Sequence, residues 1–308
     1  MNFLLRTNGV VIPMITPFTR EGKVNINDAK KLAAHLFQEK VSVLLLGTTG
    51  EALSIPDRER IRLVKAVIEK KSGKVNIFAG ISHTCFSNSV RLANHFFDLG
   101  VDAVAAHLPP LYPLSNHQIK NYFSHLADKV SGPLFIYNIP QTVHMSINLD
   151  IVEELSHHPN ICGIKDSENN FDRLKASISL WSKRSDFIHL TGWGSKSALA
   201  LLLGSDGIVP ATGNLIPVTY RKLYEAAVDG NEEIASNLQK DLDDLTNGYR
   251  EDKNLSQSIS ALKVIMEYFE LCSSHILSPL TEYSKQEKEA ILKKVLSHPS
   301  LNKLKQKL

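Results

Sequence analysis

The sequence has little cysteine and lacks the segments that mark exported or membrane proteins. Its three cysteines, Cys85, Cys162 and Cys272, lie far apart and form no C-x-x-C pair, so neither a disulfide framework nor a structural zinc site is expected. The N-terminal stretch MNFLLRTNG has no apolar core of the kind found in signal peptides. No apolar run reaches the roughly 18 residues that a membrane helix needs. We therefore expect a cytoplasmic protein with no membrane contact.

Strong charge of either sign is also missing. The 308 residues include 35 Lys or Arg and 32 Asp or Glu, a formal charge of +3, which is too small a bias to indicate nucleic-acid binding. No predicted strand is followed by G-x-G-x-x-G or a P-loop, so these nucleotide-binding motifs are absent. The twelve histidines are scattered, and no metal-ligand cluster is indicated. We expect neither a metal nor a cofactor.

The chain does contain short apolar segments that alternate with amphipathic ones. The apolar segments are typical of parallel strands covered on both faces, and they are Gly9–Ile15, Val41–Gly47, Val75–Gly80, Asp102–His107, Pro133–Asn138, Cys162–Lys165, Phe187–Gly192 and Gly207–Ala211. Strands that alternate with helices predict a parallel sheet with right-handed crossovers. Eight such units fit an α/β fold of the (β/α)8 TIM-barrel type. A doubly wound open sheet is the alternative, which the missing nucleotide motifs disfavour.

The last part of the chain has helical periodicity and no strand-like segment. We expect residues 1–230 to form the barrel and residues 231–308 to form a helical extension packed on it, because no low-complexity linker separates them. Local signals mark several helix boundaries: Asn27 or Asp28 before the first helix, Ser115 before another, and Gly100 at the end of a third.

Reactive side chains gather at the predicted strand ends, which is where the chemistry of such a barrel lies. The strand ends read GTTGE (47–51), LPPLYPLS (108–115), YNIP (137–140), Lys165, TGWGS (191–195) and IVPATGN (208–214). Each has an ordinary structural interpretation, such as a lysine that reaches water or a glycine-rich tight turn. Unrelated structural needs do not explain why all of them lie at one barrel mouth.

Lys165 ends an apolar strand in the stretch CGIKDSE. Burial beside Ile164 and other apolar neighbours disfavours the charged ammonium form. A neutral amine can attack a ketone and form a Schiff base, whose protonated nitrogen withdraws electrons. We expect Asp166 to belong to the connection that follows the strand rather than to neutralise this amine.

A proton relay and an anion site are predicted beside the lysine. The phenol of Tyr137, hydrogen-bonded to Thr48, could move protons on and off the carbinolamine oxygen, with Tyr112 as the next link outward. The amides of Thr48, Thr49 and Gly50 in the GTTGE turn could hold a carboxylate. A 2-keto acid would fit both sites at once, and the smallest such substrate is pyruvate.

Two motifs make the sequence resemble the dihydrodipicolinate synthase/N-acetylneuraminate lyase family of pyruvate-dependent class I aldolases. They are SVLLLGTTGEALSIPDRE (Ser42–Glu59) and the segment from YNIPQT, starting at Tyr137, to GIKDS (Gly163–Ser167). The resemblance covers Gly9 to about Asn214 closely and the C-terminus more loosely. It implies a barrel with a C-terminal helical domain, assembled as a homotetramer (dimer of dimers).

The resemblance also implies roles for individual residues. Lys165 would form the Schiff base with pyruvate, and Tyr137 would relay protons with Thr48 as its partner. Tyr112 would be donated across a dimer interface. Thr48 and Thr49 would bind the pyruvate carboxylate, and the backbone of Val209 would lie near the imine. All these positions keep the family's residue types.

The half of the site that binds the second substrate departs from the family pattern. Thr142 stands where dihydrodipicolinate synthases carry an arginine that clamps a carboxylate, and no neutral residue replaces such a clamp without large loss. Sialic acid lyases carry an acidic pair after the glycine of the seventh strand, but here Gly192-Trp193 is followed by Gly194-Ser195. The remaining groups, which include His144 and Ser195, suit a neutral or hydroxylated partner. His144 could equally be an ordinary loop histidine.

These features predict a lyase that forms or cleaves a 2-keto acid with pyruvate as donor and a small aldehyde as partner. The favoured subtype is a 2-keto-3-deoxy sugar-acid aldolase. Alternatives with the same lysine chemistry are a dehydratase of keto-deoxy sugar acids, dihydrodipicolinate synthase, and N-acetylneuraminate lyase. A metal-dependent class II aldolase is the rival mechanism, and a catalytically silent ligand-binding or regulatory homologue is the rival from another class.

Overall fold

The protein is described from a computed structural model, in which residues 9–305 are placed. Eight strands form one parallel sheet in the order β1-β2-β3-β4-β5-β6-β7-β8. They are β1 Val11–Pro13, β2 Ser42–Leu45, β3 Ile77–Gly80, β4 Ala103–Ala106, β5 Leu134–Asn138, β6 Ile161–Asp166, β7 Ile188–Thr191 and β8 Gly207–Ile208. A parallel bridge between Val10 and Ile208 joins the two ends of the sheet. The predicted (β/α)8 barrel is therefore confirmed, and the open sheet is ruled out.

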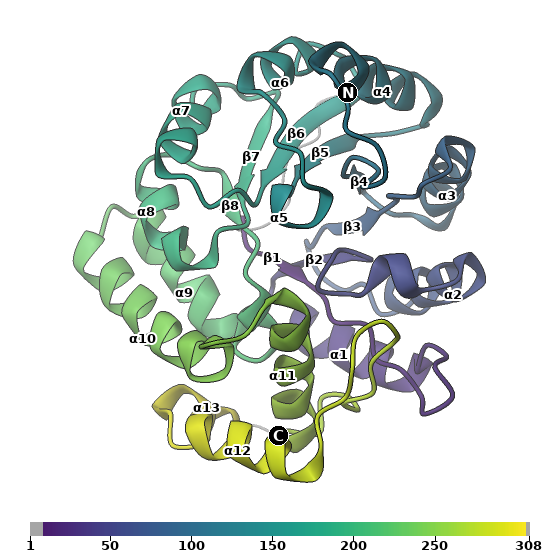
Figure 1. Ribbon diagram of the computed structural model, residues 1–308. Coiled ribbons are helices and arrows are strands. Elements are labelled where there is room, and N and C mark those ends of the chain that lie inside the picture. Colours follow the sequence, from purple (N-terminus) through teal and green to yellow (C-terminus); the bar gives the residue numbers. More distant parts are fainter. Residues whose placement is uncertain (1–8, 306–308) are drawn as a thin grey trace.

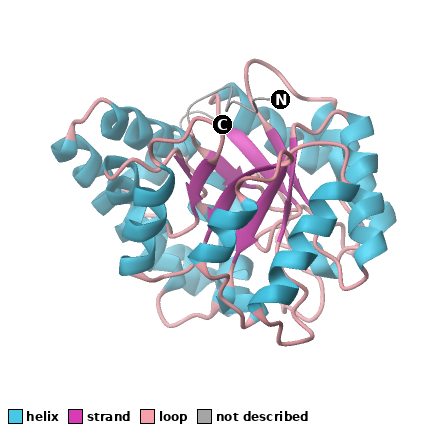
Figure 2. Cartoon of the chain, turned by 90° about the horizontal axis from the view of Figure 1, so that it is seen from above, coloured by secondary structure: helices cyan, strands magenta, loops and turns pink. Residues whose placement is uncertain are grey.

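Helices surround the strands (Figures 1 and 2). Those of the barrel are α1 Ile26–Gln38, α2 Asp57–Ile68, α3 Phe86–Leu99, α4 Asn116–Lys129, α6 Leu149–Leu155, α7 Phe171–Trp181, α8 Ser197–Leu202 and α9 Pro217–Val228. Short helical turns follow four strands: η1 Ala52–Ser54, α5 Pro140–Val143, η2 Gly194–Lys196 and η3 Ala211–Asn214. These turns shape the barrel mouth.

The C-terminal extension consists of α10 Glu232–Arg250, α11 Leu255–Tyr268, α12 Lys285–Val295 and α13 Pro299–Lys305. The predicted boundary at residue 230 falls in the turn between α9 and α10. Helix α10 packs against α8, α9 and α12, so the extension lies on the barrel. Its standing as a separate domain stays a prediction.

Side chains at the helix ends explain several boundaries. The first helix begins earlier than expected: its cap is Asn25, whose side chain accepts a hydrogen bond from the amide of Asp28. The prediction of Asn27 or Asp28 was wrong because both residues lie within the first turn, where the acidic Asp28 faces the positive end of the helix dipole. The predicted cap Ser115 forms a capping box with Gln118. Gly100 ends α3 with φ of +98°, a conformation that favours glycine.

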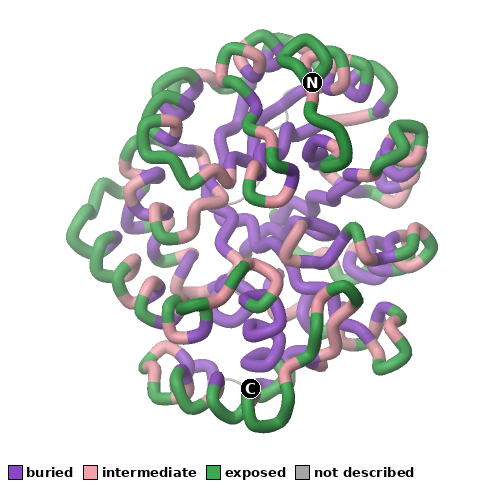
Figure 3. The backbone as a smooth tube through the Cα atoms, viewed as in Figure 1, coloured by how far each residue is buried: buried purple, intermediate pink, exposed green. Residues whose placement is uncertain are grey.

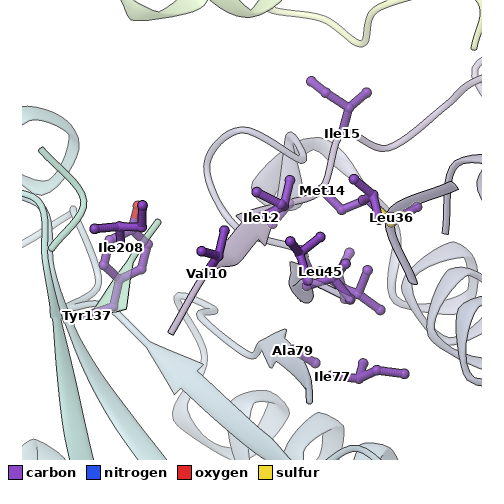
Figure 4. Packing of buried hydrophobic residues seen from close by; sticks show 14 of the residues in the cluster. Val10, Ile12, Met14, Ile15, Leu36, Leu45, Ile77, Ala79, Tyr137 and Ile208 are labelled. Carbon is purple, nitrogen blue, oxygen red and sulfur yellow. The ribbon is translucent and has the colours of Figure 1, made fainter. Parts of the chain in front are cut away.

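Two layers of apolar side chains hold the barrel together. The outer layer fills the space between strands and helices; Figure 4 shows Ile12 of β1, Leu45 of β2 and Ala79 of β3 among its members. The inner layer fills the barrel itself and includes Phe78 and Phe135, whose rings meet edge to face at 5.2 Å. The strands are accordingly the most buried part of the chain (Figure 3). This packed interior is the floor of the barrel mouth.

His189 is a buried histidine of the outer layer and makes the fold sensitive to acid. Its ring nitrogens lie 2.9 Å from Ser205 Oγ and 3.1 Å from Ser177 Oγ. Burial, reinforced by the charge of Arg173, lowers the pKa of His189 to about 3. The unfolded chain binds a proton near the ordinary pKa of about 6.5, so the free energy of unfolding falls as pH drops from 6.5 toward 3, by up to about 1.4 kcal/mol per pH unit.

We therefore expect His189→Gln, which can keep both hydrogen bonds, to reduce the loss of stability between pH 6.5 and pH 4. The measurement is urea unfolding of wild type and variant across this range. Carboxylate titration contributes equally to the pH dependence of stability in wild type and variant. The difference between the two slopes therefore reports the titration of His189. Equal slopes would contradict the assignment.

Candidate active site

A cavity of about 380 Å³ opens at the carboxyl ends of the strands. Seven residues that the sequence predicted for the site line it: Thr48, Thr49, Tyr137, Lys165, Gly192, Ser195 and Val209. They come from the ends of five strands, which the closed barrel brings to one mouth.

Lys165 lies in β6, paired in register with Tyr137 of β5. The residue is only 5% exposed, and its Nζ lies 3.9 Å from the centroid of the Tyr137 ring. Below it, a void of about 10 Å³ is lined by apolar side chains of the inner layer, and such a void holds at most about one water molecule. The lysine therefore meets water only from the cavity side.

Acidic groups near Lys165 are engaged elsewhere. Asp166 is the last residue of β6 and pairs with Arg173 Nε of α7 at 2.8 Å. Its other oxygen accepts a hydrogen bond from Asn138 Nδ2 at 2.9 Å. Within residues 9–305, Lys165 forms no ion pair with a carboxylate. As expected, Asp166 does not neutralise the amine, although it belongs to the strand rather than to the connection after it.

Tyr137 and Thr48 meet at the edge of the cavity, with 3.3 Å between the phenol oxygen and Thr48 Oγ1. His107, at the end of β4, packs edge to face on the Tyr137 ring at 5.9 Å. Burial lowers the pKa of His107, and its Nδ1 lies 2.8 Å from the carbonyl of Leu108. Sequence reasoning missed His107, although its position as a strand end was visible. It places a neutral imidazole against the tyrosine.

The GTTGE turn offers fewer amides than the sequence suggested. The amide of Gly50 donates to the carbonyl of Gly47 at 3.1 Å, within the turn itself. The amides of Thr48 and Thr49 donate to no other group in the described part of the chain. Two amides, rather than three, are thus available to an anion in the cavity, and Gly50 serves the shape of the turn.

Besides Gly50, three predicted residues do not line this cavity. Thr142, in α5, lines a neighbouring cavity of about 400 Å³ together with Thr48 and His107. His144 ends α5 in a left-handed conformation on the surface. Tyr112 is 68% exposed, in the connection between β4 and α4. Its action across a dimer interface and the assembly into a homotetramer both stay predictions.

The C-terminal extension forms one wall of the cavity, which sequence reasoning did not foresee. Side chains of α10 and the loop after it line the wall: Asp243, Thr246, Asn247, Arg250, Glu251 and Lys253. Helix α10 is attached to the barrel mouth by Thr212 Oγ1, which lies 2.9 Å from Thr246 Oγ1 and 2.8 Å from the Tyr249 hydroxyl. No local signal marks these residues, because they lie far from Lys165 in the sequence and reach the cavity only through the packing of α10 on the barrel.

Residues 9–305 contain no group of three or more His, Cys, Asp or Glu side chains arranged to hold a metal ion. The same residues include no helix that is both long and apolar enough to cross a membrane.

Comparison with known proteins gives consistent matches over most of the chain. A sequence model of the dihydrodipicolinate synthetase family matches residues 6–298. 4-Hydroxy-tetrahydrodipicolinate synthase of Pseudomonas putida is 29% identical over 235 residues, 76% of this chain and 80% of that protein. The structure of dihydrodipicolinate synthase from Bacteroides thetaiotaomicron has a TM-score of 0.90 at 25% identity and covers 96% of this chain and 99% of that one.

A variant of 2-keto-3-deoxygluconate aldolase from Sulfolobus solfataricus has the same fold. Its TM-score is 0.85 at 22% identity, covering 97% of this chain and 98% of that one.

Proposed function

Because the chain belongs to the dihydrodipicolinate synthetase family, whose members are pyruvate-dependent class I aldolases and lyases, we propose that it cleaves and forms a 2-keto-3-deoxy sugar acid. Pyruvate and a hydroxylated aldehyde are the products of cleavage. The observation that carries this proposal is the set of neutral hydrogen-bonding groups that share the cavity with Lys165. They are Gln141, Ser167, Asn169, Ser195, Thr246 and Asn247.

The lysine end of the cavity suits imine chemistry. The amine of Lys165 adds to the C2 ketone, and the carbinolamine oxygen leaves as water once Tyr137 has supplied a proton. The imine then takes up the electrons of the C3–C4 bond, the C4 hydroxyl gives its proton back to Tyr137, and the fragment that begins at C4 leaves as an aldehyde. Protonation of the enamine at C3 and hydrolysis of the imine release pyruvate. The amides of Thr48 and Thr49 hold the carboxylate throughout.

The far end of the cavity supports a hydroxylated rather than a charged partner. Its four charged side chains balance in number, because Arg250 and Lys253 are matched by Asp243 and Glu251. Thr142 stands where dihydrodipicolinate synthases carry the arginine that clamps a carboxylate, and it lines the neighbouring cavity. A semialdehyde carboxylate would thus lack the arginine that clamps it at this position in dihydrodipicolinate synthases. These features disfavour dihydrodipicolinate synthase activity.

The direct test is incubation with pyruvate and borohydride, followed by peptide mapping. An adduct on Lys165 is expected, and its absence would contradict the imine mechanism. A panel of keto-deoxy sugar acids then separates the two lysine-dependent reactions, because an aldolase releases pyruvate whereas a dehydratase does not. Efficient condensation of pyruvate with aspartate semialdehyde would overturn the specificity proposed here.

Asn247→Leu is expected to raise KM for the sugar acid by about 2- to 10-fold, since one hydrogen bond contributes about 0.5–1.5 kcal/mol. The yield of the pyruvate adduct should not change, because pyruvate occupies the lysine end. Steady-state kinetics and borohydride trapping give the two values. Asn302→Leu, on the surface of α13, is the matched control. Equal KM values for the Asn247 variant and wild type would show that the sugar acid does not bind at Asn247.

A further inference from the structure

A buried ion pair connects the GTTGE turn to the C-terminal extension. Glu51, the last residue of the motif, lies 2.6 Å from Lys263 Nζ of α11, and the two side chains are 1% and 0% exposed. The residues are far apart in sequence, but α11 lies against the barrel near β1 and β2 (Figure 1). None of the chemistry proposed above uses this pair.

Both charged groups have further partners that fix their positions. Lys263 Nζ donates to the carbonyl of His275 at 2.8 Å and lies 4.2 Å from the centroid of the Phe18 ring. Glu51 Oε2 accepts a hydrogen bond from the amide of Leu277 at 2.9 Å. The pair thus joins four segments: the connection between β1 and α1, the turn after β2, helix α11 and the segment that follows α11.

Stability alone does not account for such a pair, because buried ion pairs are commonly no more stabilising than apolar side chains of similar size. Burial raises the pKa of Glu51 and lowers the pKa of Lys263, so each charge depends on the other. What a buried pair can provide is one defined geometry. Glu51 needs such a restraint, since its φ of +57° is left-handed, a conformation that a glutamate rarely adopts.

The restraint on Glu51 is transmitted directly to the catalytic turn. The amide of Glu51 donates to the carbonyl of Thr48 at 3.0 Å. On the other side of the turn, Thr16 Oγ1 donates to the carbonyl of Gly50 at 2.8 Å. The Thr48 hydroxyl lies 3.3 Å from the Tyr137 hydroxyl, so a small displacement of the turn would separate the two. Thr48 and Thr49 also carry the two free amides.

We propose that Glu51 and Lys263 are positioning residues, through which the C-terminal extension holds the turn from Gly47 to Glu51 so that Thr48 meets Tyr137 and the free amides face the substrate carboxylate. This inference rests on the proposed function. It assigns the extension a role in catalysis at the pyruvate end of the cavity, beyond the wall that it forms at the far end.

Pyruvate in D2O provides an assay that needs no knowledge of the aldehyde. The Lys165 imine loses a C3 proton to give an enamine, which takes up a deuteron at C3, and hydrolysis returns labelled pyruvate. Proton NMR follows the loss of the methyl signal. The variants are Glu51→Gln/Lys263→Met, which removes both charges while keeping similar volume, and Glu51→Asp, which keeps the charge but withdraws the carboxylate by one methylene.

Both variants are expected to fold and to exchange at a maximal rate about 10- to 100-fold below wild type, with half-saturation at higher pyruvate concentration, because small misplacement of catalytic groups costs rates of this order. Lys71→Met is the control. Lys71 Nζ lies 2.6 Å from Asp102 Oδ2, and this ion pair lies just before β4, at the opposite end of the barrel. This control should lower the melting temperature and leave the exchange rate unchanged.

The outcomes separate the two proposals. Wild-type exchange combined with slow exchange in the folded variants supports the inference. Folded variants that exchange like wild type would overturn the inference alone. A wild type that neither exchanges nor forms an adduct on Lys165 would overturn the proposed function, and this inference with it.

Discussion

Lys165→Ala is expected to abolish the pyruvate adduct and to lower kcat/KM by on the order of 10⁴-fold or more, as removal of a covalent catalyst generally does. No other lysine is expected to replace it, because Lys165 alone lies at the end of a barrel strand among the described residues, and Lys253, which also lines the cavity, lies in the loop after α10. The variant should fold, since Lys165 has no carboxylate partner among the described residues whose charge would be left unpaired. Borohydride trapping with peptide mapping and steady-state kinetics measure the two effects.

Lys175→Ala is the matched control for this experiment. Lys175 also stands over an aromatic ring, with Nζ 4.3 Å from the Phe171 centroid, but it lies on the exposed side of α7. Its removal should change neither the adduct nor the rate. An adduct that maps to a different lysine in wild type, or substantial turnover by Lys165→Ala, would show that the imine is formed elsewhere.

This comparison also addresses the two rival interpretations of the chain. A regulatory homologue could bind pyruvate and form the adduct, yet it would show no turnover that Lys165→Ala removes. A metal-dependent aldolase would lose activity on treatment with EDTA and would keep some activity without the lysine. Only the imine mechanism predicts that adduct and turnover disappear together.

Tyr137→Phe is expected to retain pyruvate binding and to lower the turnover rate by about 10²- to 10³-fold, the range over which a positioned acid–base group acts. The substitution removes only the hydroxyl. The ring keeps its contacts with the Lys165 amine at 3.9 Å and with His107 at 5.9 Å, so the lysine should stay in place. Single-turnover trapping should show slow imine formation that still reaches a similar final yield.

Tyr283→Phe provides the control for loss of a hydrogen-bonded tyrosine hydroxyl. The Tyr283 hydroxyl donates to the carbonyl of Gln257 at 3.2 Å in the C-terminal extension, away from the cavity. This variant should turn over like wild type. If Tyr137→Phe did the same, Tyr137 would not be the proton relay, and His107 or a water molecule in the cavity would need to be tested in its place.

Much of the fold and the reactive end of the site could be predicted from the sequence. Parallel strands buried on both faces produce short apolar runs, and those runs were visible for all eight strands. Because every strand of a parallel barrel ends at the same mouth, Lys165, Tyr137 and Thr48 could be placed together from their positions at strand ends. Even so, a local preference misplaced the start of the first helix, where Asn25 rather than a later residue accepts the amide of Asp28.

The sequence by itself therefore determined the barrel and the cluster at the strand ends, because each depends on patterns within one strand or turn. Only the tertiary structure decided which residues complete the site. It engaged the Gly50 amide within its own turn, put Thr142 in the neighbouring cavity, and brought α10 and the Glu51–Lys263 pair to the mouth. Such contacts join segments remote in the chain, and their distances follow from how whole helices pack on the barrel, which no local pattern encodes.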